Sequence, residues 1–94
     1  MELALPDVRQ NAARHRYEFD TENGEALAFY RLSDGAMTFT HTEVPAALRG
    51  RGIGSAMMRA VLADVRAQGL EIVATCPFVA DYIDRHPEFS DLLA

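Results

Sequence analysis

The spacing of apolar residues changes once along this chain of 94 residues, near Pro45, and that change constrains the fold. Before it, the stretches 15–21, 26–32 and 36–44 either alternate apolar and polar residues or are apolar throughout, as β-strands do. After it, residues 55–68 carry apolar side chains at the spacing of one helix face, namely Met57, Met58, Val61, Leu62 and Val65. The pattern predicts an α+β domain in which a helix follows three strands.

The connections between the three strands are short, and their residues favour tight turns. Glu22-Asn23-Gly24-Glu25 contains the Asn-Gly pair of a hairpin turn, and Ser33-Asp34-Gly35 supplies a second turn. Strands joined in this way form an antiparallel meander. Alternation in the first strand predicts one face formed by His15, Tyr17, Phe19 and Thr21, with the charged residues on the other. In the third strand it predicts one face formed by Met37, Phe39, His41 and Glu43, with three threonines opposite.

The rest of the chain predicts one parallel strand and a second, shorter helix. Gly69 is a typical helix end, and residues 70–76 are mostly apolar and β-branched. A strand reached through one helix pairs in parallel with the strand before that helix. After Pro77, a helix that stops near His86 is indicated by Val79, Tyr82 and Ile83, and a packed tail by Phe89, Leu92 and Leu93. The predicted order is β-β-β-α-β-α, a single domain over residues 1–94 with a mixed sheet.

Charge and cysteine content exclude several classes of function. Fourteen acidic residues against nine arginines and no lysine give a formal net charge of −5, which argues against nucleic-acid binding. The single Cys76 excludes an internal disulfide, and no Cys/His cluster predicts a metal. No apolar run approaches the ~20 residues that span a bilayer, and residues 1–7 lack a signal peptide's positive charge. We expect a cytoplasmic protein, either a monomer or a weak homodimer, without a membrane partner.

A loop rich in glycine and arginine joins the third strand to the long helix. Three of the six glycines fall within five positions of Arg49-Gly50-Arg51-Gly52-Ile53-Gly54-Ser55. A helix that begins there directs unpaired N–H groups and the positive end of its dipole at the loop, and two arginines add positive charge. The first hypothesis is a binding site for a phosphate or pyrophosphate. The structural alternative is a glycine-rich turn that only packs the helix on the sheet.

The spacing within this loop excludes two common nucleotide motifs. A P-loop requires a lysine after its last glycine, and this chain has no lysine. A dinucleotide-binding G-x-G-x-x-G that starts at Gly50 would need glycine where Ser55 stands, and it would follow a βαβ opening rather than a meander. The spacing that remains is Arg-x-x-Gly-x-Gly, formed by Arg49, Gly52 and Gly54.

This spacing resembles the Gln/Arg-x-x-Gly-x-Gly/Ala signature of the GNAT superfamily of acetyl-CoA-dependent N-acetyltransferases. Together with His41-Thr42-Glu43-Val44-Pro45, Thr75-Cys76-Pro77-Phe78-Val79 and Tyr82, it is similar to the small GNAT-like family of about one hundred residues, over roughly residues 8–93. The resemblance implies that coenzyme A lies between strands that part near Glu43 and Cys76. It assigns the oxyanion donor to the backbone N–H of Val44. It assigns the pyrophosphate to the backbone of Arg49, Gly50, Arg51, Gly52, Ile53, Gly54 and Ser55.

Acetyl transfer to an amine requires a base, an oxyanion donor and an acid for the departing thiolate. Glu43 is a candidate base if it is buried beside Met37 and Phe39; alternatively it is a solvated carboxylate, or one paired with an arginine of the loop. His41 is a second candidate base, or a core residue. The resemblance places Tyr82 as the acid, although Tyr82 also belongs to the apolar stripe of the last helix.

Cys76 is the departure from an ordinary site of this family. Its sulfur is expected near the thioester, where it would accept the acetyl group and pass it on, or would simply pack as a small apolar side chain. The two helices that follow the first strand in full-length GNAT domains are replaced here by the turn at Asn23-Gly24. We therefore expect an open site for an unidentified amine acceptor. The alternative from another class is a non-catalytic module that binds coenzyme A through the retained loop.

Overall fold

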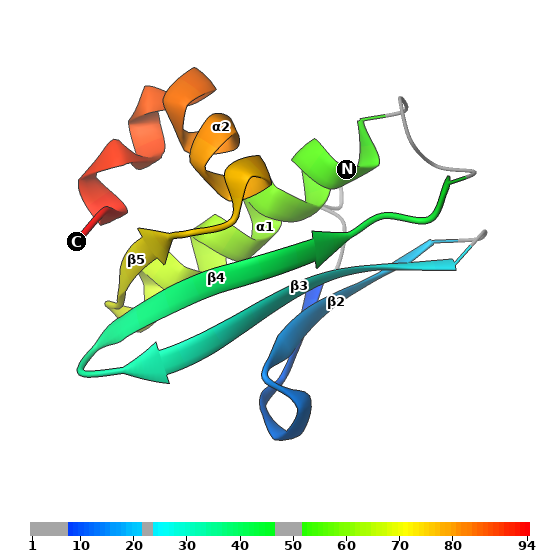
Figure 1. The fold of residues 1–94 in the computed structure, drawn as a ribbon, viewed down its shortest axis with the longest axis horizontal. Coiled ribbons are helices and arrows are strands. Elements are labelled where there is room, and N and C mark those ends of the chain that lie inside the picture. Colours follow the sequence, from blue (N-terminus) through cyan, green and yellow to red (C-terminus); the bar gives the residue numbers. More distant parts are fainter. Residues whose placement is uncertain (1–7, 22–23, 47–51) are drawn as a thin grey trace, which may run out of the picture.

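The structure is a computed structural model that describes residues 8–21, 24–46 and 52–94. Five strands form one mixed sheet, and the helices pack against one side of it (Figure 1). The elements are β1 (Val8–Asn11), the 3₁₀ turn η1 (Ala12–Arg14), β2 (Arg16–Thr21), β3 (Gly24–Ser33), β4 (Ala36–Glu43), α1 (Ile53–Gln68), β5 (Glu71–Ala74), α2 (Pro77–Arg85) and the 3₁₀ turn η3 (Pro87–Leu92). The prediction of an α+β fold with a mixed sheet is confirmed.

The strands lie in the sheet in their order along the chain. The first four pair antiparallel, and β5 pairs in parallel with β4 after the crossover through α1. The predicted meander and parallel strand are therefore confirmed. The β3–β4 turn has left-handed backbone at Asp34 and Gly35, with φ of 52° and 78°. Residues 22–23 of the other predicted turn lie outside the described residues, but Thr21 pairs with Gly24 as a two-residue hairpin requires.

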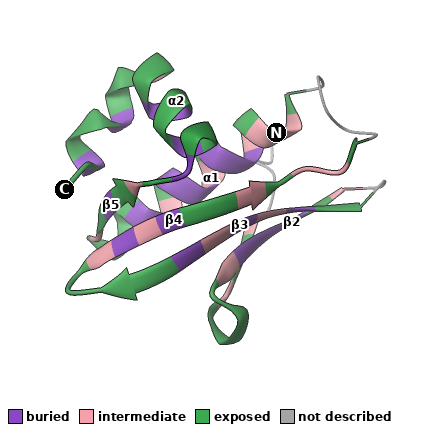
Figure 2. Ribbon diagram, viewed as in Figure 1, coloured by how far each residue is buried: buried purple, intermediate pink, exposed green. Residues whose placement is uncertain are grey.

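The core lies between the sheet and the helices, and purple segments mark it in Figure 2. All five apolar residues predicted for the core face of α1 are fully buried: Met57, Met58, Val61, Leu62 and Val65. Gly69 ends α1 in the left-handed conformation, as predicted. Val79, Tyr82 and Ile83 of α2 join the same cluster, and so do Phe89 and Leu92 of η3. Leu93 does not, since 44% of it is exposed.

The N-terminal part of the sheet differs from the prediction in three respects. β1 was not predicted, because a single apolar residue, Val8, marks it in the sequence. His15 is exposed at the end of η1, with φ of 54°, and so does not share a buried strand face with Tyr17. Glu18 was expected among exposed charges, yet it is 5% exposed. Its carboxylate accepts hydrogen bonds from Arg16 Nε at 2.7 Å and Asn11 Nδ2 at 3.0 Å, and Arg9 lies 3.2 Å away.

A network of side-chain hydrogen bonds ties α1 to three strands. The buried Tyr17 hydroxyl of β2 donates to Asp64 Oδ2 of α1 at 2.6 Å. Gln68 Nε2, one turn further along α1, donates to the same carboxylate oxygen at 2.6 Å and to Gln10 Oε1 of β1 at 2.9 Å. Gln10 in turn donates to the Tyr30 hydroxyl of β3 at 2.9 Å. These polar contacts fix the end of α1 that lies far from the glycine-rich loop.

Candidate functional site

The two strands that flank the predicted cofactor site part halfway along β4. Their parallel pairing runs from Ala36 with Glu71 to Phe39 with Ala74 and ends there. The last contacts are the Cys76 N–H and the Thr75 hydroxyl, which both donate to the Phe39 carbonyl oxygen, at 3.1 Å and 2.9 Å. β4 continues to Glu43, whereas the chain after β5 turns into α2. We call the space between these two diverging segments the β4–β5 gap.

A β-bulge lies in β4 at the start of this gap. Tyr30 of β3 pairs with Phe39, and the preceding Phe29 pairs with His41, so Thr40 is an extra residue without a partner in β3. Side chains paired across a sheet point to the same face, so the bulge reverses which β4 residues face the core. Met37 and Phe39 face the core, whereas His41 and Glu43 point to the opposite face. The predicted single face for these four residues is therefore wrong.

His41 and Glu43 form a polar pair on the face of the sheet that the described helices do not cover. His41 Nε2 lies 3.1 Å from Glu43 Oε2, and the two side chains are 59% and 55% exposed. The His41 ring stacks on Phe29 with ring centroids 5.8 Å apart, which fixes its orientation. Of the alternatives that the sequence left open for Glu43, the structure therefore shows a solvated carboxylate and not one buried beside Met37 and Phe39, because the bulge turns it toward solvent. A pairing of Glu43 with Arg49 or Arg51 lies outside the described residues.

The His41–Glu43 pair borders a cavity of about 360 Å³ at the end of β4. Four of its six lining residues are titratable or polar, and they come from β3, β4 and the segment that follows β4: Glu25, His41, Thr42, Glu43, Val44 and Pro45. Two carboxylates make this cavity acidic. Such a lining attracts a cationic ligand more than an anionic one.

Thr42 links this cavity to Cys76 on the other face. It points toward the helices, and its hydroxyl oxygen lies 3.8 Å from Cys76 Sγ, within hydrogen-bond distance for sulfur. Cys76 is 6% exposed and immediately precedes α2. The contact shows that Cys76 lies beside the β4–β5 gap, as the sequence predicted. Thr42 was not predicted from the sequence as a site residue. It could have been found from its position between His41 and Glu43, because neighbouring side chains in a strand point to opposite faces of the sheet.

The start of α1 provides the described part of the glycine-rich loop. Gly52 has φ of 75°, a left-handed conformation that favours glycine, and α1 begins at the next residue without a side-chain cap. The first hydrogen bond of the helix joins the Ala56 N–H to the Gly52 carbonyl oxygen. Ile53, Gly54 and Ser55 come before Ala56 in the first turn, so their N–H groups have no acceptor within α1 and point out of the start of the helix. An anion would be stabilised there. Arg49, Gly50 and Arg51 lie outside the described residues.

Tyr82 is buried in α2, where its ring packs against His86 and Phe89. Its ring stacks on His86 with centroids 3.9 Å apart, and 5% of the residue is exposed. Burial raises the pKa of Tyr82, Arg59 acts to lower it, and Glu88 adds to the rise. In the described part of the chain, its hydrogen bonds and ring contacts do not reach Cys76, His41 or Glu43. Thr42, Cys76, His41 and Glu43 all border the gap, and the role of Tyr82 as the acid stays a prediction.

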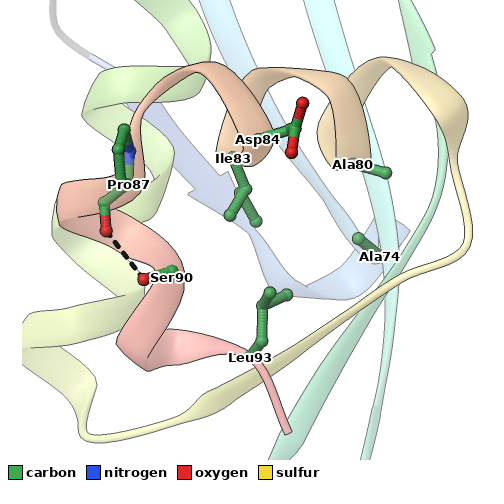
Figure 3. Close-up of a pocket in the computed structure, with 7 residues that line it drawn as sticks. All are labelled: Ala74, Ala80, Ile83, Asp84, Pro87, Ser90 and Leu93. Carbon is green, nitrogen blue, oxygen red and sulfur yellow. Dashed lines mark hydrogen bonds between the residues drawn. The ribbon is translucent and has the colours of Figure 1, made fainter.

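A second cavity, of about 430 Å³, lies between α2, η3 and the end of β5 (Figure 3). It is lined by Ala74, Ala80, Ile83, Asp84, Pro87, Ser90 and Leu93. Ser90 is engaged locally, because its hydroxyl donates to the Pro87 carbonyl oxygen at 2.8 Å. None of the residues singled out in the sequence for catalysis or cofactor binding lines this cavity.

In residues 8–21, 24–46 and 52–94, side chains of His, Cys, Asp and Glu do not gather into a group of three that could hold a metal ion. Within the same residues, each helix is too short or too polar to cross a membrane.

A family model, two curated relatives and a solved structure agree on what this chain is similar to. A family model described as GCN5-related N-acetyl-transferase matches residues 16–92. Protein NATD1 of Mus musculus is 40% identical over 85 residues, which cover 85% of this chain and 77% of that protein. Protein NATD1 of Xenopus tropicalis is 38% identical over 85 residues, with 85% and 78% covered. The solution structure of a GCN5-like protein from Staphylococcus aureus superposes with a TM-score of 0.71 at 25% identity, over 98% of this chain and 91% of that one.

Proposed function

The chain belongs to the GCN5-related N-acetyltransferase family, and on that basis we propose that it binds acetyl-CoA and transfers the acetyl group to an amine. The observation that carries this proposal is the β4–β5 gap. Cys76 and Thr42 border it on the helix face, and His41 and Glu43 lie on the other face. Two substrates could therefore approach one point from opposite sides of the sheet.

The donor side of the site fits an anionic cofactor. Acetyl-CoA would supply an acetyl group activated as a thioester. The N–H groups of Ile53, Gly54 and Ser55 at the uncapped start of α1, with Gly52 before them, would hold its pyrophosphate. Arg49, Gly50 and Arg51 belong to the same proposed loop. The assignment of the oxyanion donor to the backbone of Val44 stays a prediction.

The acceptor side fits a cationic amine. Glu25 and Glu43 line the cavity at the end of β4 and would attract an ammonium group. His41 would take a proton from that ammonium: in the neutral tautomer that donates from Nε2 to Glu43, its Nδ1 is a free acceptor. Glu43 would then hold the resulting imidazolium. In this scheme Glu43 orients and stabilises the base, and His41 is the base.

Two routes remain for the acetyl group. In the direct route the deprotonated amine attacks the thioester carbon, the carbon–sulfur bond breaks, and coenzyme A leaves as a thiol once protonated. In the covalent route the Cys76 thiolate attacks the thioester carbon, the bond from that carbon to the sulfur of coenzyme A breaks, and the departing thiolate takes up the proton that Cys76 lost. The neutral amine then attacks the carbonyl carbon of acetyl-Cys76, the bond to the Cys76 sulfur breaks, and the proton lost by the amine nitrogen restores the Cys76 thiol. Thr42 is placed to hydrogen-bond the Cys76 sulfur in the covalent route.

Calorimetry and mass spectrometry test the proposal together. We expect acetyl-CoA to bind, and a cationic amine from a broad panel to be acetylated. A Cys76→Ala variant that still binds but no longer transfers, with acetyl found on Cys76 of the unmodified protein, supports the covalent route. Full transfer by Cys76→Ala with loss in His41→Ala supports the direct one. Binding without transfer to any amine would instead favour the non-catalytic module, and no binding would refute both.

A further inference from the structure

Gly54 is the point at which β4, α1 and α2 approach one another. A Cβ atom at this position would lie 2.8 Å from Cζ of Phe78 and 3.5 Å from Cγ2 of Val44. Val44 follows β4, Gly54 lies in the first turn of α1, and Phe78 lies in the first turn of α2. The aromatic ring thus crosses from the helix that follows Cys76 to the helix start near the other side of the β4–β5 gap.

The space at Gly54 is filled by the Phe78 ring. A contact of 2.8 Å is shorter than real Cβ contacts, so any larger residue at position 54 would displace the ring. Backbone strain does not explain this glycine, because among the described glycines a positive φ is found at positions 24, 35, 52 and 69 and not at Gly54. In the described structure, position 54 therefore requires glycine because the Phe78 ring occupies the space that a side chain would need.

Phe78 is also one of four large apolar residues that remain exposed in the described part of the chain, and 37% of it is accessible. Among them it is the one whose ring contacts the start of α1 and lies two residues after Cys76. An aromatic ring that is partly exposed to solvent offers a flat apolar surface to a ligand that lies beside it.

We propose that Gly54 and Phe78 are a matched pair, in which the glycine leaves room for the ring and the ring packs against the pantetheine arm of the acyl donor. This inference rests on the proposed function and adds a positioning residue to it. The ring would contact the part of the donor between its thioester, near Cys76, and its pyrophosphate, at the start of α1. Phe78 would contribute to donor affinity and not to the chemical step.

A double-mutant cycle tests the pair, with Gly54→Ala, Phe78→Ala and the combined variant measured against the unmodified protein. Calorimetry would use coenzyme A and, separately, 3′-phospho-ADP, which has the pyrophosphate but lacks the arm. We expect Phe78→Ala to weaken coenzyme A binding about tenfold, the size of one lost aromatic contact, and to leave 3′-phospho-ADP binding unchanged. Gly54→Ala should weaken coenzyme A binding through the displaced ring, and should have no further effect once Phe78 is alanine.

The variants are expected to fold, because the atom that must yield to Gly54→Ala is the tip of an exposed side chain. Leu32→Ala, which removes another large exposed apolar side chain at the far end of β3, is the matched control and should not alter binding. Unchanged coenzyme A binding in Phe78→Ala would overturn the inference alone. The inference would also be overturned if Gly54→Ala weakened the binding of both coenzyme A and 3′-phospho-ADP, and did so equally with phenylalanine and with alanine at position 78. No binding of coenzyme A by the unmodified protein would overturn the proposed function as well.

Discussion

Phe39 and His41 are separated by one residue in β4, and their side chains lie on opposite faces of the sheet. The extra residue Thr40 causes this: Phe39 pairs with Tyr30 and faces the core, and His41 pairs with Phe29 and faces away from it. The pairing between β4 and β5 ends at Phe39, the residue immediately before Thr40. One insertion in the ladder therefore both orients the polar pair and opens the gap beside it.

Deletion of Thr40 is expected to leave a folded protein that no longer binds coenzyme A. The deletion would bring Phe39 and His41 into consecutive positions, opposite Tyr30 and Phe29, so every pairing in the ladder could persist. β4 would straighten and the gap would narrow. Circular dichroism would report the fold, and calorimetry the binding. Thr40→Ala, which keeps the extra residue, should bind normally; a deletion variant that binds as well as this control contradicts the role given to the bulge.

Tyr17→Phe is expected to destabilise the protein by about 1.5–3 kcal/mol, since it removes a hydrogen bond from a buried hydroxyl to a charged carboxylate. The hydroxyl donates to Asp64 at 2.6 Å from a fully buried side chain. Urea unfolding monitored by fluorescence measures the change. Tyr30→Phe is the comparison, because the one hydrogen bond that the described residues give its hydroxyl comes from Gln10. We expect a smaller loss there, and equal losses would argue against a special role for the contact with Asp64.

The stability of the protein should fall above about pH 10, and Tyr17 should be a cause. Burial raises the pKa of Tyr17, and the hydrogen bond to Asp64 and its charge raise it further. The unfolded chain would ionise first, so this contribution is complete below the ordinary tyrosine pKa and is lost as the pH rises toward the folded value. Melting temperatures of the protein and of Tyr17→Phe should therefore converge at high pH. Parallel curves would show that another group is responsible.

Glu18 should make the stability of the protein fall at acid pH, the opposite of the effect of Tyr17. The hydrogen bonds from Arg16 and Asn11 lower the pKa of this carboxylate, and the charges of Arg16 and Arg9 add to the effect. The stability that it contributes is present above the unfolded value, near 4.5, and is lost as the pH falls through the folded one. Glu18→Gln should lower the melting temperature at pH 7, and the difference should shrink toward pH 3. Asp20→Asn, at a 61% exposed carboxylate, should change it less.

Gly35→Ala and Gly52→Ala form a matched pair of backbone variants. Both glycines have positive φ, 78° and 75°, and an added Cβ would meet nothing within 4 Å at either. Each substitution should therefore cost about 1–2 kcal/mol of conformational energy alone. We expect similar losses of stability by thermal unfolding, and weaker coenzyme A binding in Gly52→Ala only. Equal binding by the two variants would remove Gly52 from the proposed loop.

The parts of the fold that local chemistry specifies could be predicted from the sequence. The core face of α1 follows from helical spacing, its end from Gly69, and the β3–β4 turn from Asp34-Gly35. β1 could not be predicted, because it is held by pairing with β2 and by the contacts of Arg9 with distant acids rather than by its own apolar residues.

The candidate site was harder to predict for a related reason. The alternation from Met37 to Glu43 is unbroken in the sequence, so nothing local marks Thr40 as an extra residue. The bulge is visible only once β4 is aligned with β3, and with it comes the placement of His41 and Glu43. Cys76 was predicted beside the gap because it ends the strand predicted over residues 70–76, although β5 itself ends two residues earlier, at Ala74. Its partner Thr42 is far away in the sequence and depended on the same alignment.

The hydrogen-bond network around Gln68 has a consequence for local opening of the native state. Gln10, Tyr17 and Gln68 join the short edge strand, its neighbour and the last turn of the long helix into one polar cluster. Detaching β1 would break the hydrogen bond between Gln10 and Gln68, and fraying of the last turn of α1 would break the same hydrogen bond from the other side. The amide hydrogens of β1 and of the last turn of α1 should therefore exchange with solvent as one cooperative unit, although the two segments lie far apart in the sequence.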